Sequence, residues 1–176
     1  QMGSAIGSTA DMLDEETTGQ VMEFLLRFAS LVPKFCATSN PFEISERLVG
    51  SDDYAYAAPL YGYTNYSRKG FRDRVLAYDD VPSFDGRATG SQLGGAGIAV
   101  SAYSEHPELA ARIAVYLSSA EAQRGPYTER HGQPGNLRAW LSPRMNEITH
   151  GFFRNTLRSM EGSWVRPRLV GWPDFQ

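Results

Sequence analysis

The hydrophobic pattern is clearest in residues 94–117, where a glycine-rich loop, a short apolar run and an amphipathic segment follow one another. The apolar run, residues 98–100, is short enough to be one buried strand. Apolar residues then recur every four positions at Leu109, Ile113 and Leu117. This spacing predicts a helix from about Glu108 with one packed face, and Ser104 is its expected N-cap.

Three further helices are indicated by apolar spacing and by residues that start or end helices. The first runs from Asp14 or Thr17 to about Leu31, with acidic residues in its first turn. A short helix over residues 42–49 follows an Asn-Pro turn signal and is closed by a glycine. The third begins at a Ser-Pro pair and is expected to span residues 142–160.

Tyrosines gather in the middle of the chain, where five of the nine lie within residues 54–66. Residues 53–57 alternate in the manner of a strand, and Pro59 interrupts the ladder. Beyond the proline, one side of an extended segment carries Tyr61, Tyr63 and Asn65. Residues 75–78 are a candidate for a further short strand. Together with residues 98–100, these segments predict a mixed α/β fold with few strands.

The composition is that of one domain of ordinary size, or of a substantial piece of a larger one, with 176 residues and an apolar fraction of 41%. The net charge of −3 disfavours a general nucleic-acid role, which depends on a basic surface. Cys36 is the single cysteine, which excludes an intrachain disulfide. No run approaches the ~18 apolar residues of a membrane span. The stretch from Gln1 carries no secretion signal, as expected of a processed protein or an expressed fragment.

Charged residues are unevenly distributed along the chain. Residues 11–23 carry five acids and no base, whereas residues 138–168 carry six arginines and two acids. Two solvated faces would produce this pattern, and so would a cationic rim beside a ligand.

Motifs for catalysis are weak throughout. Residues 95–97 start like a dinucleotide fingerprint, but the third glycine is missing and a predicted strand follows. The three histidines are isolated from one another and have no cysteine partners at metal-site spacing. Glycosidase carboxylates converge from separate elements across roughly 5–9.5 Å, whereas two aspartate pairs here are adjacent in sequence: Asp52/Asp53 and Asp79/Asp80. We therefore expect no cofactor, no metal ion and no enzymatic activity.

The side chains needed to bind a sugar are present. A sugar offers flat C–H patches and a rim of hydroxyls, which aromatic faces and polar groups match. One candidate, Gln133, lies in an expected loop over residues 125–136, where the order Gln-Pro-Gly is typical of a type II turn. The full set is Tyr61, Tyr63, Asn65, Gln133, Trp140, Trp164, Trp172, Arg166 and Arg168. The same residue types are common in cores and on solvated surfaces, so the signal is not specific.

Several motifs occur in the order found in a known family. Residues 94–101 read Gly-Gly-Ala-Gly-Ile-Ala-Val-Ser, and the helix after them ends in Leu-Ser-Ser-Ala-Glu-Ala-Gln at residues 117–123. A Leu-x-x-Gly-Asp-x-Ala-like unit precedes them at residues 48–55. A glycine-proline loop at residues 132–135 and an Arg-Pro pair at residues 166–167 follow them. Over roughly residues 42–168, the chain resembles the extracellular solute-binding proteins of family 1, the sugar-type binding components of ABC importers.

The resemblance implies a two-lobed α/β protein of the periplasmic-binding-protein-like type II fold, with a mixed sheet and flanking helices. Such a protein closes on a carbohydrate or small polar solute and delivers it to ABC permease subunits in the membrane. Residues 1–176 would form a single domain, the C-terminal part of an extracellular protein that is anchored as a lipoprotein at full length. The implied lining residues are Gly94, Gly95, Tyr63 and Gln133, with Trp164, Arg166 and Arg168 behind them.

Non-catalytic binding of a sugar or similar polar solute is therefore the leading hypothesis. Two others stay open. A fragment of a carbohydrate-active hydrolase would depend on one of the four paired aspartates. A plain interaction domain would use all of its aromatic residues for packing.

Overall fold

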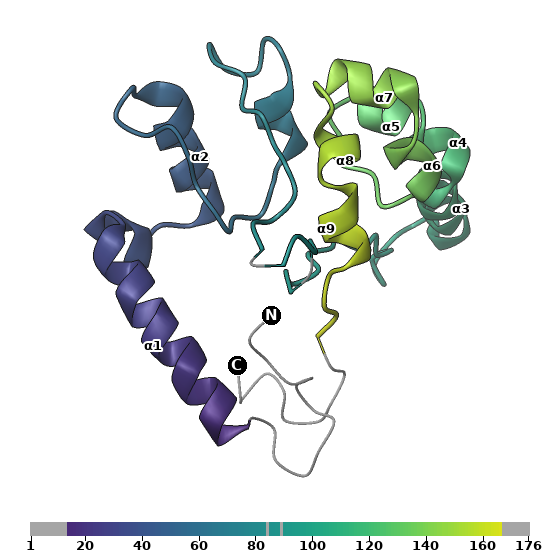
Figure 1. Ribbon diagram of the computed structural model, residues 1–176. Helices are drawn as coiled ribbons and strands as arrows, with labels where there is room; N and C mark the ends of the chain where they lie inside the picture. The colour runs from purple at the N-terminus through teal and green to yellow at the C-terminus, as the bar shows by residue number, and fades with distance from the viewer. Residues whose placement is uncertain (1–13, 84, 89, 167–176) are drawn as a thin grey trace.

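The computed structural model describes residues 14–83, 85–88 and 90–166 of the chain. These residues form helices joined by extended and irregular segments, without a sheet (Figure 1). Within them, β-type pairing is limited to isolated bridges, between Lys69 and Arg72 and between Gln92 and Trp164. The prediction of an α/β fold with a mixed sheet is therefore wrong for the described part of the chain.

The segments predicted as strands lack partners. Residues 53–57, 75–78 and 98–100 are not in strands, because a strand needs a neighbour that continues the ladder of hydrogen bonds. Leu76 donates one hydrogen bond to the carbonyl of Tyr66 (2.8 Å), but the two segments form no ladder. An alternating pattern alone therefore does not produce a strand here.

The N-terminal helices begin and end close to their predicted positions. Helix α1 spans Glu15–Leu31, and the Asp14 carboxylate accepts the Thr17 N–H at its start (2.7 Å). A 3-10 turn, η1, spans Lys34–Ala37. Helix α2 spans Pro41–Gly50 and starts with a capping box, which satisfies two amides of the helix end. No helix among the described residues is long and apolar enough to cross a bilayer.

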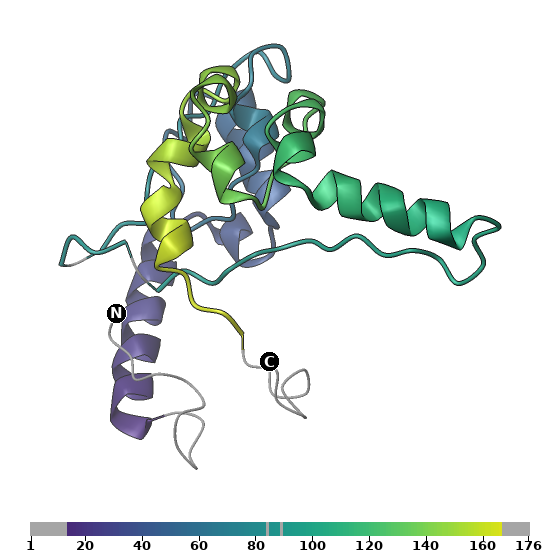
Figure 2. The ribbon, with the colours of Figure 1, turned by 90° about the vertical axis from the view of Figure 1, so that its right-hand side faces the viewer.

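The predicted amphipathic helix is confirmed as α3, Pro107–Ser118, but its surroundings differ from the expectation. The N-cap is His106, whose side chain makes no capping bond, so the prediction of Ser104 as N-cap is wrong; Ser104 Oγ accepts the His106 N–H (3.2 Å) before the helix begins. The extended segment before α3 and the helix itself project together from the rest of the chain (Figure 2). Leu109 and Ile113 are 54% and 50% exposed. The predicted packed face of α3 is thus not covered by the described residues.

The C-terminal third folds into a cluster of short helices. They are α4 (Ala120–Gln123), α5 (Pro126–Glu129), α6 (Leu137–Trp140), α7 (Pro143–Ile148), α8 (Phe152–Asn155) and α9 (Leu157–Glu161). The expected loop over residues 125–136 therefore contains a helical turn, α5. Gly135 does not adopt a positive φ, so the Gln-Pro-Gly sequence does not form the predicted type II turn.

The single helix predicted for residues 142–160 is divided into α7, α8 and α9. Helix α7 ends at Ile148, and the next residues to leave the right-handed helical region are His150 (φ +48°) and Gly151 (φ +80°), the N-cap of α8. The buried side chain of Asn146 stabilises this break, because its Oδ1 accepts the Arg154 N–H (2.8 Å) at the start of the next turn. The chain can therefore change direction without leaving that amide unpaired.

The core lies among these short helices and consists of Trp140, Met145, Phe152 and Phe153. Three partly buried residues pack against it: Tyr78, Ile148 and Leu157. Tyr78 comes from the preceding irregular segment, and its ring meets that of Phe152 edge-on at 4.7 Å. The core thereby joins the middle of the chain to its C-terminal helices.

Hydrogen bonds reinforce the same junction. The Ser159 N–H and hydroxyl both donate to Asp80 Oδ1 (2.8 and 2.7 Å), and the Val81 N–H donates to the Ser159 hydroxyl (2.8 Å). The buried guanidinium of Arg68 donates to the carbonyl of Thr128 in α5 (2.6 Å). These bonds position residues 61–81, which we call the middle segment and which carry Tyr61, Tyr63 and Asn65 of the predicted site.

Candidate functional site

Residues 61–66, which we call the tyrosine segment, pass directly over the helical core. A side chain at Gly62 would not fit, because a Cβ there would lie 2.9 Å from the ring of Phe152. The amide of Gln133 holds the segment at two points. Its oxygen accepts the Thr64 N–H (3.0 Å), and its nitrogen donates to the Gly62 carbonyl (3.2 Å). Gln133 therefore fixes the backbone on both sides of Tyr63.

Tyr61 lies at the exposed end of this segment, against the glycine-rich loop. Its side chain is 45% exposed, and a Cβ on Gly94 would lie 3.0 Å from its ring. Gly95 is exposed and has open space at its Cβ position. Just before Gly94, Leu93 donates to the Trp164 carbonyl (2.8 Å), and Trp164 donates to Ser91 (2.7 Å). A chain of contacts thus connects four predicted site residues: Tyr61, Gly94, Gln133 and Trp164.

Tyr63 and Asn65 have different surroundings from Tyr61. The ring of Tyr63 stacks on that of Phe42 in α2, with centroids 4.1 Å apart. A 3-10 turn, η2, then begins at Thr64 and ends at Ser67. Because this turn redirects the chain, Tyr61, Tyr63 and Asn65 do not share one side of a strand. Asn65 Oδ1 is buried and has no hydrogen-bond partner among the described residues.

The remaining predicted residues lie elsewhere. Trp140 is 4% exposed and belongs to the core, where its indole N–H donates to the Pro134 carbonyl (2.8 Å). Arg166 is exposed, two residues beyond Trp164. Arg168 and Trp172 fall outside the described residues, so the structure does not place them.

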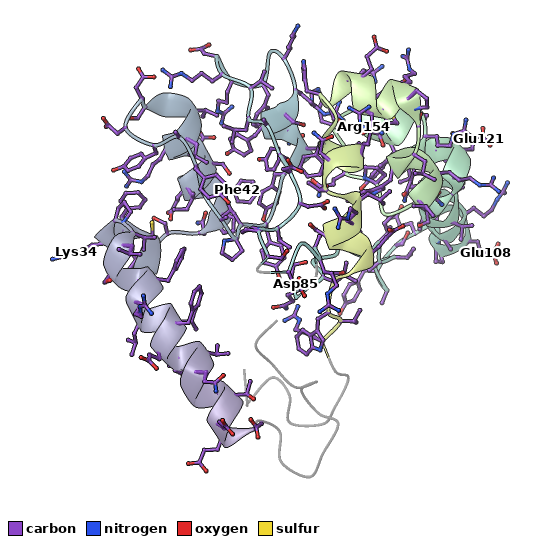
Figure 3. All side chains as sticks on the ribbon, in the orientation of Figure 1. Lys34, Phe42, Asp85, Glu108, Glu121 and Arg154 are labelled. Carbon is purple, nitrogen blue, oxygen red and sulfur yellow. The ribbon has the colours of Figure 1, made fainter. Side chains whose placement is uncertain are left out.

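A hollow of about 570 Å³ opens between α2 and η2, on the side where Phe42 faces the middle segment (Figure 3). Its lining residues are Asn40, Phe42, Glu43, Glu46, Arg47, Asn65, Tyr66, Phe71 and Arg72. Asn65 is the one predicted site residue in this set. The sequence does contain a signal for the others, because Phe42 and Glu46, like Glu43 and Arg47, are four residues apart and therefore share a helix face.

Glu46 is the centre of a hydrogen-bond network at one wall of the hollow. Its carboxylate accepts the Tyr66 hydroxyl (2.6 Å) and two guanidinium nitrogens of Arg72 (2.7 and 3.1 Å). The bond from Arg72, with that from Tyr66, holds the pKa of Glu46 below its ordinary value. Burial, together with the bond to Glu46, raises the pKa of Tyr66 to about 12. Arg72 also lies 4.4 Å from the ring centre of Phe71, so this wall is fixed from several directions.

The paired aspartates are bound to their neighbours. Asp52 forms an ion pair with Arg74 (2.8 Å), and Asp53 accepts the Ser51 hydroxyl (2.8 Å). Asp79 accepts the N–H of Asp80, which itself is bound to Ser159 as described above. In the described ranges, no three histidine, cysteine or acidic side chains gather in the manner of metal ligands.

Comparison of the chain with models of protein families, with curated proteins and with solved structures found no match. The functional proposal below is therefore based on the residue types and geometry of the site, since no related protein supports it.

Proposed function

We propose that this chain is the C-terminal part of a non-catalytic binding protein for a sugar or similar polar solute. The observation that carries the proposal is the position of Tyr61, whose exposed ring lies against Gly94 beside the open backbone of Gly95. An aromatic face next to accessible peptide groups matches the C–H patches and hydroxyls of a sugar. Gln133 supports this arrangement by fixing the backbone that follows Tyr61.

The exposed apolar surfaces of α1 and α3 favour the presence of a second lobe that packs against this part of the protein. In α1, the polar residues of the last three turns, Glu23, Arg27 and Ser30, form one narrow stripe. Around them, Leu26 and Leu31 are 69% and 82% exposed. A helix that is apolar on most of its circumference is normally buried on all sides. A single partner helix in a coiled coil would cover only one narrow strip of it.

Helix α3 repeats this arrangement, with Glu108 and Arg112 as its polar stripe and Val115 73% exposed. We infer that a second lobe of the binding protein surrounds both helices and closes the solute site. In this proposal the complete protein is extracellular, anchored as a lipoprotein, and delivers the solute to an ABC permease.

Isothermal titration calorimetry with uncharged mono- and oligosaccharides tests the proposal. We expect binding without turnover, and we expect Tyr61→Ala to weaken it about fivefold, as loss of about 1 kcal/mol of aromatic contact predicts. Tyr56→Ala is the matched control, because Tyr56 is 76% exposed and outside the site. Absence of binding to every saccharide would refute the proposal. Hydrolysis of an aryl glycoside, lost on changing one of the paired aspartates to alanine, would favour a hydrolase instead.

A further inference from the structure

We propose that the hollow between α2 and η2 is a subsite for one uncharged sugar ring, with Phe42 as its stacking platform. This inference rests on the proposed solute-binding function and adds a location and a ligand class to it. The binding surface predicted from the sequence did not include Phe42.

The ring of Phe42 has the properties of a binding platform. It is 50% exposed although it belongs to the first turn of α2 and lines the hollow. Tyr63 stacks against it with an angle of 22° between the ring planes. Since Tyr63 backs the ring, Phe42 is held in one orientation before a ligand arrives, and its exposed half remains available for the C–H face of a sugar.

The polar groups of the hollow are also held in place. Asn40 Oδ1 accepts the Glu43 N–H (3.0 Å), and the Glu43 carboxylate accepts the Asn40 N–H (2.9 Å). This capping box uses one oxygen of each side chain and leaves the Asn40 amide nitrogen and the second Glu43 oxygen for a ligand. On the next turn, Arg47 lies 4.0 Å from the ring centre of Phe35, which fixes its guanidinium at the rim. The hollow thus offers donors and acceptors suited to hydroxyl groups.

The charges that line the hollow balance. Glu46 and Arg72 form an ion pair (2.7 Å), and Glu43 and Arg47 add one further charge of each sign. A carboxylate or an ammonium ligand would meet a like charge as well as an opposite one, so the balanced lining gives no net attraction to either. The size of the hollow, about 570 Å³, is within the range of small-molecule sites. An uncharged saccharide fits this arrangement better than a uronic acid or an amino sugar.

Calorimetry on the full chain tests the subsite with glucose, maltose and maltotriose as uncharged probes, and with glucuronate and glucosamine as charged ones. We expect Phe42→Ala to weaken binding of the best uncharged probe about fivefold. Phe42→Trp should retain binding, because it keeps a flat face. Tyr56→Ala is again the matched control, since Tyr56 is 76% exposed and does not line the hollow.

Two measurements keep the test independent of folding defects. Circular dichroism compares the thermal midpoint of Phe42→Ala with that of the wild type, and the tryptophan fluorescence of Phe42→Trp should change when saccharide is added. Wild-type affinity in Phe42→Ala together with weakened binding in Tyr61→Ala would overturn the subsite and leave the proposed function standing. Equal affinity for glucose and for either charged probe would overturn the ligand class. Failure of the wild type to bind any probe would refute the proposed function itself.

Discussion

Replacement of Gln133 by alanine should loosen the tyrosine segment and lower the stability of the whole chain. The side chain joins a loop to backbone groups 69 and 71 residues away in the sequence. Thr64 is 1% exposed, so its N–H is left buried and unpaired, at a cost of about 1–2 kcal/mol. Loss of the longer bond to Gly62 adds about 0.5 kcal/mol. The sum, about 2 kcal/mol, corresponds to a decrease of about 4–8 °C in Tm.

Urea unfolding followed by circular dichroism measures this effect, and two further variants sharpen it. Gln133→Glu keeps an acceptor for the Thr64 N–H, but its carboxylate faces the Gly62 carbonyl without a donor. The pKa of the new carboxyl should therefore be raised, and the stability lost at neutral pH should be regained as the pH falls and the group becomes protonated. Gln20→Ala, at an exposed position of α1, should change stability by less than about 0.5 kcal/mol. If Gln133→Ala behaved like Gln20→Ala, Gln133 would not be the attachment point inferred here.

Three other variants or conditions have defined outcomes. Phe153→Ala, at a position with no exposed surface, should cost about 3–5 kcal/mol in urea unfolding, and a cost below about 1 kcal/mol would contradict the core described here. Asn40→Ala removes one half of the capping box of α2 and should cost about 1 kcal/mol in thermal unfolding, with no loss if the box does not form. The pKa of Tyr66 is about 12 in the folded state, whereas its ordinary value is 10.0. The free energy of unfolding should therefore fall as the pH rises from about 10 to about 12. Tyr66→Phe should remove that slope in alkaline unfolding measurements, and an unchanged slope would assign it to another group.

The parts of the fold that could be predicted are those set by neighbouring residues. Asp14 at the start of α1 and the capping box at Asn40 lie within one turn of the amides that they satisfy, so the sequence contains the complete signal. The start of α3 after His106 was predictable to within a residue for the same reason, since Pro107 favours a first helical turn. Helix ends of this kind need no information from distant residues.

The parts that could not be predicted depend on side-chain and strand contacts that apolar spacing does not indicate. The break at Gly151 is stabilised by Asn146, whose amide also donates to Trp140 and Ser142 carbonyls (2.7 and 3.0 Å), and apolar spacing contains no sign of these bonds. The three expected strands are missing because, among the described residues, none of them forms a ladder of hydrogen bonds with a neighbouring segment.

The candidate site shows the same division between local and distant signals. The sequence selected both the tyrosine segment and Gln133, and the structure brings the two into contact. Phe42 was missed because its stacking on Tyr63 follows from how α2 packs on the middle segment. The alternation and spacing of residues 61–66 do not predict this packing.

The attachment of the middle segment to the C-terminal helices has a consequence during synthesis on the ribosome. The acceptor for the buried Thr64 N–H is 69 residues downstream, and the serine that binds Asp80 is 79 residues downstream. The middle of the chain therefore leaves the exit tunnel well before its partners exist. The contacts of residues 61–81 with the last third cannot form until that third has been translated, whereas the contacts of Tyr63 and Tyr66 with α2 can form earlier. A translational pause within residues 82–132 would prolong the time for which the tyrosine segment lacks its C-terminal partners.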